Sequence, residues 1–130
     1  MSKSLAIKLS ERELITVNEN DQLLNAINKL VKYNIGAIPV INSNRKLAGI
    51  ISERDIVKSL ANYKNKDYSI LLVNQLMTKK VVSCEKEVLS DKLMELMTIN
   101  KIRHIPIVEN YAPKGIVSIG DIVNRLKEKV

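Results

Sequence analysis

The sequence has very few aromatic residues and a single cysteine. Its 130 residues include four Tyr, no Phe and no Trp, and the only thiol is that of Cys84. One cysteine cannot form an internal disulfide, and such a composition suits a reducing cytoplasm. With so few aromatic side chains the chain is not expected to form the stacking platform on which RRM and OB folds bind bases. The core must therefore be built from Ile, Leu, Val and Met.

Long hydrophobic runs are also missing. The longest aliphatic run, residues 70–73, is far shorter than the roughly 20 residues that a membrane span needs. Charged residues interrupt the N-terminal segment before a signal peptide could form. We therefore expect a soluble cytoplasmic protein that does not contact a membrane. Hydrophobic residues (45%) and charged residues (27%) are both near globular averages, so we expect a core that needs no disulfide.

The charge is positive but spread along the chain. Lys and Arg number 21 against 14 acidic residues, a net charge of +7. The first 65 residues carry 10 basic and 6 acidic residues, and the remainder carry 11 and 8. No basic arm or block is present, so the charge is only a weak indication of a polyanionic partner. Nucleic-acid binding is a possible function that the sequence does not favour.

The chain repeats itself. Three segments recur in the same order 66 or 67 residues later, which indicates a tandem duplication of about 60 residues. The paired segments are Leu14–Val17 with Val81–Cys84, Ile38–Ile41 with Ile105–Val108, and Gly49–Val57 with Gly115–Val123.

Each copy predicts the same order of elements, β-α-β-β-α. Apolar residues at helical spacing predict the first helix, and their registers differ by one residue between the copies. The first copy reads as a β-rich segment Leu14–Val17, a helix with the stripe Leu23, Leu24, Ile27, Leu30 and Val31, a strand Ala37–Ile41, a turn Asn42–Asn44, a strand Leu47–Ile51 and a helix Ile56–Leu60. The second reads as Val81–Cys84, a helix with Leu89, Leu93, Leu96 and Met97, a strand His104–Val108, a turn Asn110–Pro113, a strand Gly115–Val117 and a helix Ile122–Leu126.

These elements predict an α/β (α+β) fold of two repeats. One unit of this size is marginally stable alone, so we expect the two sheets to pack on each other with pseudo-twofold symmetry. The expected division is residues 8–60 for the first repeat, 61–72 for a polar connector and 73–127 for the second repeat. A short helix is expected from Ile70 to Met77.

The most informative motif is Gly-Ile-x-Ser-x-x-Asp where a strand meets a helix. One interpretation is a capping box, in which Ser52 and Ser118 cap the helices and Asp55 and Asp121 reach back. The other is a nucleotide site, in which the helix N-terminus and the Ser hydroxyl favour phosphate and the Asp accepts hydrogen bonds from a ribose diol. The two interpretations are compatible.

The combination of motifs resembles a tandem pair of CBS domains, also called a Bateman module. The resemblance rests on the duplicated β-α-β-β-α pattern, the Ile-Pro-Val and Ile-Pro-Ile strands, both Gly-x-x-Ser-x-x-Asp motifs and the Leu76-Met77-Thr78 segment. It covers roughly residues 8–127 and is typical of stand-alone prokaryotic and archaeal members.

The resemblance implies that adenosine-containing ligands bind in clefts between the repeats. The ligands would be AMP, ADP, ATP or S-adenosylmethionine, acting as regulators, with no cofactor required. The Asp would hold the ribose hydroxyls and hydrophobic residues would enclose the adenine. One implied site combines Ile50, Ser52, Arg54 and Asp55 with Val82, Ser83, Arg103, His104 and Ile105. The other combines Ile116, Ser118 and Asp121 with Thr16, Val17, Gly36, Ala37 and Ile38.

The two implied sites differ in charge. Arg103 and His104 stand where the first repeat has Gly36 and Ala37. We therefore expect the Asp55 site to prefer phosphate-bearing ligands and the Asp121 site to be weak, empty or suited to a less charged ligand.

No motif predicts catalysis or a metal site. The sequence contains no P-loop, no Gly-x-Gly-x-x-Gly and no cluster of metal ligands. We expect Cys84 to act as a small hydrophobe. The predicted function is that of a regulatory module that senses adenosine ligands, forms a homodimer and signals to a regulated protein whose identity the sequence does not give. The alternatives are nucleic-acid binding and a purely structural dimerisation role.

Overall fold

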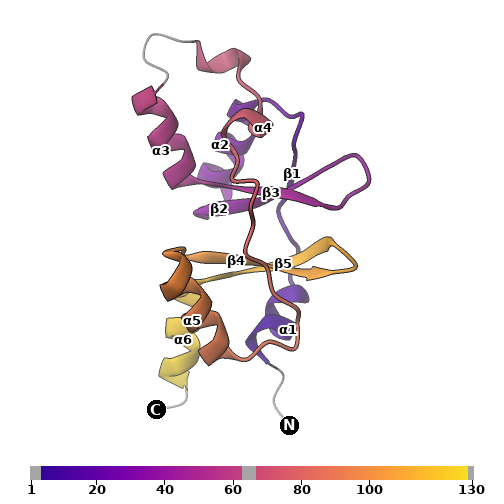
Figure 1. Ribbon diagram of the computed structural model, residues 1–130, viewed down its shortest axis with the longest axis vertical. Helices are drawn as coiled ribbons and strands as arrows, with labels where there is room; N and C mark the ends of the chain where they lie inside the picture. Colours follow the sequence, from indigo (N-terminus) through magenta and orange to yellow (C-terminus); the bar gives the residue numbers. More distant parts are fainter. Residues whose placement is uncertain (1–3, 63–66, 129–130) are drawn as a thin grey trace. The chain divides into compact units, whose positions relative to one another are not determined.

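The computed structural model describes residues 4–62 and 67–128 (Figure 1). The chain divides into two compact units. We call residues 15–81 the first-repeat unit, and residues 1–14 together with residues 82–130 the second-repeat unit. Each unit thus contains one repeat together with the segment that precedes the other repeat.

The first-repeat unit is built on a three-stranded sheet in the order β1-β2-β3. Strand β1 runs parallel to β2, and β2 forms an antiparallel hairpin with β3. Helix α2 connects the two parallel strands, and α3 follows β3 directly (Figure 1). The elements are β1 (Val17–Asn18), α2 (Leu23–Tyr33), β2 (Ala37–Ile41), β3 (Leu47–Ser52), α3 (Glu53–Asn62), the 3-10 turn η1 (Tyr68–Ile70) and α4 (Val73–Leu76).

The second-repeat unit repeats this plan with a two-stranded sheet. Strands β4 and β5 form an antiparallel hairpin, and Cys84 makes a single parallel bridge to Ile107 where β1 lies in the other unit. The elements are α1 (Leu5–Ser10), α5 (Ser90–Asn100), β4 (His104–Glu109), β5 (Ala112–Ser118) and α6 (Ile119–Glu128). The expected mixed α/β fold is confirmed, whereas the packing of one sheet on the other stays a prediction.

Each unit has its own hydrophobic core. Both cores combine the inner faces of a hairpin with a helix of the same repeat and with the segment that precedes the other repeat. Leu71, Val73 and Leu76 are buried in the first-repeat core, while Leu5 and Leu9 of α1 are buried in the second. The predicted connector 61–72 therefore contains a core residue, and α1 is a helix that the sequence reading did not include.

Hydrogen bonds attach these two segments to the units that they cover. The Leu23 N–H donates to Leu71 O at 2.8 Å, and the Val73 N–H donates to Asp21 O at 2.9 Å. At the start of α1, Ser4 Oγ caps the helix by accepting from the Ile7 N–H and donates to the Lys86 carbonyl.

The helices of the two repeats share one register. Helices α2 and α5 each have eleven residues and each ends on a left-handed cap, at Asn34 and Lys101, 67 residues apart. The predicted one-residue difference between the helices is therefore wrong. Its cause is Leu89, which we placed on the helical stripe but which precedes α5 and is 66% exposed.

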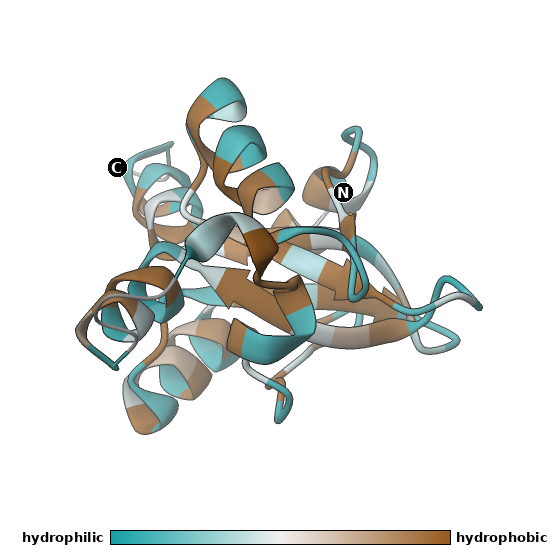
Figure 2. Ribbon diagram, turned by 90° about the horizontal axis from the view of Figure 1, so that it is seen from above, coloured by the Kyte–Doolittle hydropathy of each residue, from teal (hydrophilic) through white to brown (hydrophobic). Residues whose placement is uncertain are grey.

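The apolar stripe of α2 is also narrower than the sequence predicted. Leu23, Ala26 and Leu30 are buried, whereas Val31 is 77% exposed and Leu24 is 39% exposed. The small side chain of Ala26 lies where α2 meets the core, so the buried stripe follows i, i+3, i+7. Figure 2 shows apolar and polar bands alternating on the helices. Several of the apolar residues are exposed, Val31 among them.

The turn between β4 and β5 is shorter than predicted. Asn110 and Tyr111 have φ values of 52° and 65°, as in a two-residue type I′ turn. Ala112 and Pro113 were predicted in the turn but belong to β5, where they pair with Glu109 and Val108. Pro113 is accommodated because this end of the hairpin carries a β-bulge.

The remaining predicted elements differ from the structure mainly at their ends. Strand β2 has the predicted bounds, while β3 and β4 each extend one residue further. Both closing helices begin three residues earlier than predicted, because each starts directly at the Ser cap. The predicted helix 70–77 is divided into η1 and α4, and of the two β-rich segments only Val17 and Cys84 make strand contacts.

Candidate functional site

The Ser-x-x-Asp motif of the first repeat lies where β3 ends and α3 begins. Asp55 Oδ2 accepts hydrogen bonds from the Ser52 N–H and from Ser52 Oγ, both at 2.9 Å. The Asp55 N–H donates to Ser52 Oγ at 3.2 Å. This reciprocal pattern is a capping box, and it fixes both side chains at the N-terminus of α3.

The second repeat has the same geometry where β5 meets α6. Asp121 Oδ2 accepts from the Ser118 N–H at 2.8 Å and from Ser118 Oγ at 2.9 Å, and the Asp121 N–H donates to Ser118 Oγ at 3.1 Å. The capping interpretation is thus confirmed in both repeats. Each Ser hydroxyl gives its proton to the Asp, so it would have to rotate before it could donate to a phosphate.

The other carboxylate oxygens differ between the repeats. Asp55 Oδ1 accepts a hydrogen bond from Thr78 Oγ1 at 3.0 Å. In the part of the chain that the structure describes, Asp121 Oδ1 has no donor. Sequence analysis included Thr78 only in a segment typical of the family, because nothing in its spacing indicates that it lies beside Asp55.

Gly49 and Gly115 open the two motifs, and each is approached closely by another backbone. A Cβ on Gly49 would lie 2.7 Å from Thr78 O and 2.9 Å from Met77 Sδ. A Cβ on Gly115 would lie 3.1 Å from the Cα of Ser10. At both positions the segment preceding a repeat crosses the strand where the side chain is missing. Ile50 and Thr78 exchange two backbone hydrogen bonds at this crossing, of 3.0 and 2.8 Å.

Each unit also brings the start of its central strand to its own motif. Gly36 O accepts from the Glu53 N–H at 3.0 Å, and Arg103 O accepts from the Ile119 N–H at 2.9 Å. Ala37 pairs with Ser52 across the first hairpin, and His104 pairs with Ser118 across the second. The N–H groups of Glu53 and Ile119, the first residues of α3 and α6, therefore already have acceptors within the protein.

The hydrophobic residues among the predicted ligand contacts fall into two groups. Ile50 and Ile116 are half-buried, in strands whose neighbours Ile51 and Val117 are fully buried, so they lie on the faces turned away from the cores. Four others have at most 2% of their surface exposed, so only their backbone groups could contact a ligand: Val17, Ala37, Ile38 and Ile105.

The segments entering the first strands hold the remaining predicted residues. Thr16 precedes β1, and its carbonyl accepts a hydrogen bond from Lys29 Nζ at 2.9 Å. Val82 and Ser83 precede Cys84, whose N–H donates to Pro106 O. Arg54 is exposed in the first turn of α3. The sequence reading missed Lys29, although it is a charged residue between the apolar Ile27 and Leu30 of α2.

The single thiol of the chain belongs to Cys84, which is buried. Burial raises the pKa of Cys84 to about 11, so its thiol is protonated at neutral pH. Within residues 4–62 and 67–128, no three His, Cys, Asp or Glu side chains come together as metal ligands. None of the helices in this part of the chain has the length and apolar character required to cross a membrane.

Comparison with known proteins identifies the repeats. The family model of the CBS domain matches residues 6–62 and 73–128. The inosine-5′-monophosphate dehydrogenase of Methanocaldococcus jannaschii is 35% identical over 117 residues, which cover 89% of this chain and 22% of that enzyme. The chain thus spans about a fifth of this curated relative.

Solved structures agree with this match. A CBS-domain-containing protein from Agrobacterium tumefaciens has a TM-score of 0.84 and 35% identity, covering 95% of this chain and 93% of its own. The CBS domain pair of protein MJ0100, crystallised with 5′-methylthioadenosine and S-adenosyl-L-methionine, has a TM-score of 0.85 and 28% identity, with coverage of 99% and 100%. The chain therefore belongs to the CBS-domain family, and its two repeats are a tandem pair of CBS domains.

Proposed function

We propose that this CBS pair binds an adenosine-containing ligand and reports its occupancy to a regulated protein. The ligand class is AMP, ADP, ATP or S-adenosylmethionine, and the role is regulatory rather than catalytic. The observation that carries the proposal is the pair of capped Ser-x-x-Asp junctions, each with a carboxylate fixed at a helix N-terminus. The MJ0100 pair, crystallised with two adenosyl ligands, supports it.

The carboxylates are suited to a ribose. In each motif Ser holds Oδ2, so Oδ1 is the oxygen left for a ligand; in Asp55 this oxygen also accepts from Thr78 Oγ1. Ribose offers two adjacent hydroxyl donors. Ile50 and Ile116 lie half-buried on the sheet faces turned away from the cores and would contact the base. We assign Asp55 and Asp121 to ribose and the main-chain groups of the first and second strands to adenine.

The mechanism is a shift in conformational equilibrium. A ligand can change the arrangement of the protein only by as much as its affinity differs between the two arrangements. Because the Ser-x-x-Asp residues lie at the N-termini of α3 and α6, binding of the ligand to them would shift the positions of these helices. The regulated protein would then respond to the exposed surfaces of the same helices.

A thermal-shift panel tests the proposal. Wild type, Asp55→Asn and Asp121→Asn are heated with AMP, ATP, S-adenosylmethionine and NAD at millimolar concentration. A ligand at about 100 times its dissociation constant adds about 2.7 kcal/mol to the free energy of unfolding, which raises the midpoint by several degrees. We expect one adenosyl compound to raise the wild-type midpoint and one Asp variant to lose that rise.

Asp91→Asn is the matched control, since Asp91 lies in the first turn of α5 outside both motifs. It must respond to the ligand as wild type does. If no adenosyl compound shifts any midpoint, the motifs are helix caps only and the proposal is wrong.

Exposed apolar residues on the closing helices support a homodimer. Val57 and Leu60 of α3 are 64% and 48% exposed, and Val123 and Leu126 of α6 are 43% and 44% exposed. These positions are equivalent in the two repeats, 66 residues apart.

Sedimentation equilibrium of Val57→Asp with Val123→Asp should show a monomer where wild type is a dimer. Tyr111→Asp, in the exposed hairpin turn, should leave the dimer intact.

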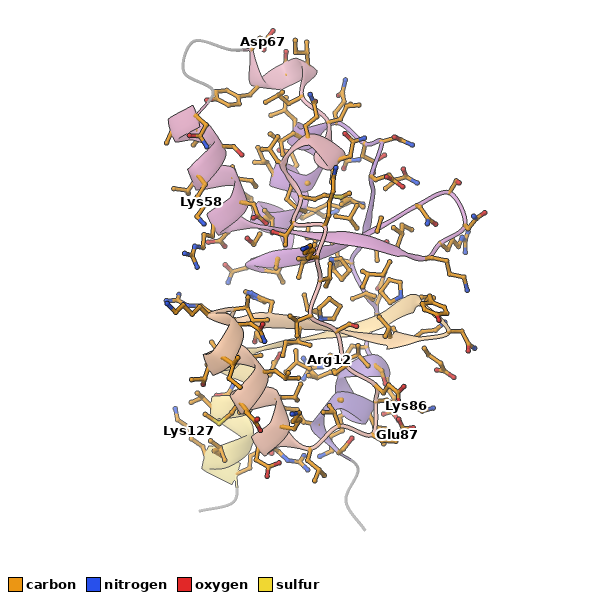
Figure 3. The ribbon with its side chains drawn as sticks, viewed as in Figure 1. Arg12, Lys58, Asp67, Lys86, Glu87 and Lys127 are labelled. Carbon is orange, nitrogen blue, oxygen red and sulfur yellow. The ribbon has the colours of Figure 1, made fainter. Side chains whose placement is uncertain are left out.

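Nucleic-acid binding is the weaker candidate. Lys58 of α3 and Lys127 of α6 extend from the outer sides of their helices (Figure 3). Scattered lysines of this kind give a sequence-independent interaction whose affinity falls steeply with salt. Binding of an RNA or DNA oligonucleotide that survives physiological salt would favour this function.

A further inference from the structure

Lys29 places a positive charge at the entrance to β1. Its Nζ donates to the carbonyl oxygen of Thr16 at 2.9 Å, from half-way along α2. Thr16 directly precedes β1 and belongs to the group of residues assigned to one adenosine ligand. An ammonium group has three N–H donors, and Thr16 takes one of them.

The charged group of Lys29 donates to a neutral acceptor. In the described part of the chain Lys29 forms no ion pair, and its one hydrogen-bond acceptor is a neutral carbonyl. The side chain is also half-buried rather than fully exposed. The half-buried stem limits where the ammonium group can lie, and an anion at this position would accept a charge-assisted hydrogen bond from it.

The second repeat has no lysine at this position. The helices share one register through their caps at Asn34 and Lys101, so Lys29 corresponds to Leu96. The sequence comparison of Gly36 with Arg103 gave a cation to the second repeat only. Lys29 adds a cation to the first repeat as well. In the first repeat the cation lies on helix α2, next to the start of β1, whereas in the second repeat Arg103 directly precedes β4.

We propose that Lys29 determines specificity at the Thr16 group of residues by binding the phosphate of an adenine nucleotide. This inference rests on the proposed function, because it assumes that adenosine compounds bind here. It replaces the expectation that this site is suited to a less charged ligand. Lys29 keeps its bond to Thr16 O and directs a second N–H to a phosphate oxygen. A ligand without phosphate gains nothing from it.

Calorimetric titration of the full chain tests the inference. Asp55→Asn serves as the background, because it removes the binding that depends on the Asp55 carboxylate. The probes are AMP and 5′-methylthioadenosine, which lacks a phosphate. Adding Lys29→Met should weaken AMP binding about 10-fold or more, the value of one charge-assisted hydrogen bond, and change 5′-methylthioadenosine binding less than about 2-fold. Lys29→Arg should restore most of the AMP affinity.

Lys32→Met is the matched control. It removes the same charge from the same helix, but Lys32 Nζ lies over the Tyr33 ring, 5.3 Å from its centroid. The Lys32→Met variant in the Asp55→Asn background should bind AMP and 5′-methylthioadenosine as tightly as the Asp55→Asn background does. Equal weakening of both ligands by Lys29→Met would overturn the inference, since Lys29 would then only hold Thr16 in place. Unchanged AMP binding, or no AMP binding to the background, would overturn it as well.

The proposed function fails in a different way. If the wild-type chain binds neither AMP nor 5′-methylthioadenosine, both the function and the role of Lys29 are wrong. If wild type binds AMP and Lys29→Met binds it equally well, only the inference about Lys29 is wrong.

Discussion

Asp55 and Asp121 occupy equivalent places in the two repeats, yet their carboxylates have different surroundings. Both use Oδ2 to complete a capping box, but only Asp55 also accepts a hydrogen bond from Thr78. A single hydroxyl thus makes the first junction more constrained than the second. The sequence predicted both capping boxes from local spacing. It did not predict the Thr78 contact, because that contact joins residues 23 positions apart.

The first prediction concerns this difference. Asp55→Ala and Asp121→Ala should each lower the free energy of unfolding by about 1 kcal/mol through loss of the cap. Asp55→Ala should cost a further 0.5–1 kcal/mol, roughly the value of one hydrogen bond, because Thr78 also loses its acceptor. Urea denaturation without ligand measures both values.

A double-mutant cycle isolates the contribution of Thr78. In a Thr78→Val background the two alanine variants should cost the same amount. An excess cost of Asp55→Ala that persists in this background would mean that Thr78 does not cause the difference.

The second prediction concerns Cys84. Burial raises its pKa from 9.0 to about 11, so the folded state holds the thiol proton more tightly than the unfolded state. Stability should therefore fall as the pH rises from about 9 to 11. At pH 8 iodoacetamide should label the folded protein far more slowly than the urea-unfolded protein, as mass spectrometry can follow. Equal labelling rates would show that the thiol is accessible.

At the scale of elements, local patterns determine most of the fold. The hairpin strands and the closing helices follow from β-branched runs, turn residues and Ser caps, and the sequence predicts them to within a few residues. Helix α1 was missed because its six residues carry only three buried apolar side chains, Leu5, Ala6 and Leu9. Its partner is a strand far away in the sequence, and periodicity contains no information on such a contact.

The third prediction tests the crossing at Gly49. A methyl group there would lie 2.7 Å from Thr78 O, so Gly49→Ala should displace residues 77–78 and cost about 1–3 kcal/mol of stability. Gly115→Ala should cost less, because its nearest contacts are at 3.1 Å and include a flexible Ile107 side chain. Thermal denaturation compares the variants.

Gly120→Ala provides the control for this series. The new Cβ would meet its nearest atom, Ser118 Oγ, at 3.6 Å, an ordinary contact within a helix. It should leave stability unchanged or raise it by up to about 1 kcal/mol. If all three alanine variants behave alike, close approach is not the reason for the two motif glycines.

At the scale of the whole molecule, neither core is complete within its own repeat. The first-repeat core needs Leu71, Val73 and Leu76, and the second needs α1. The units of packing therefore differ from the units of sequence repetition. The sequence reveals the duplication because corresponding positions in the two repeats carry similar residues. It could not reveal the exchange of covering segments, because that exchange depends on contacts between residues far apart in the sequence.

The fourth prediction follows from the place of α1. Deleting residues 1–11 removes Leu5, Ala6 and Leu9 from the second-repeat core. Backbone amides of β4 and β5 should then exchange with deuterium much faster, while those of β2 and β3 keep their protection. Leu9→Ala, a milder change, should act in the same direction. Equal acceleration in both hairpins would show that the two units unfold together.

The position of α1 also has a consequence during synthesis. Residues 15–81 leave the ribosome as one continuous stretch, so the first-repeat unit can fold while the rest is still being made. Helix α1 emerges before that unit but must wait for residues 112–118, against which it packs. During this interval the leucines of α1 are not covered by β5. When several ribosomes translate one mRNA, the nearest β4-β5 hairpin can belong to a neighbouring nascent chain. Rapid translation at high expression should therefore favour intertwined chains, in which α1 of one molecule covers the second repeat of another.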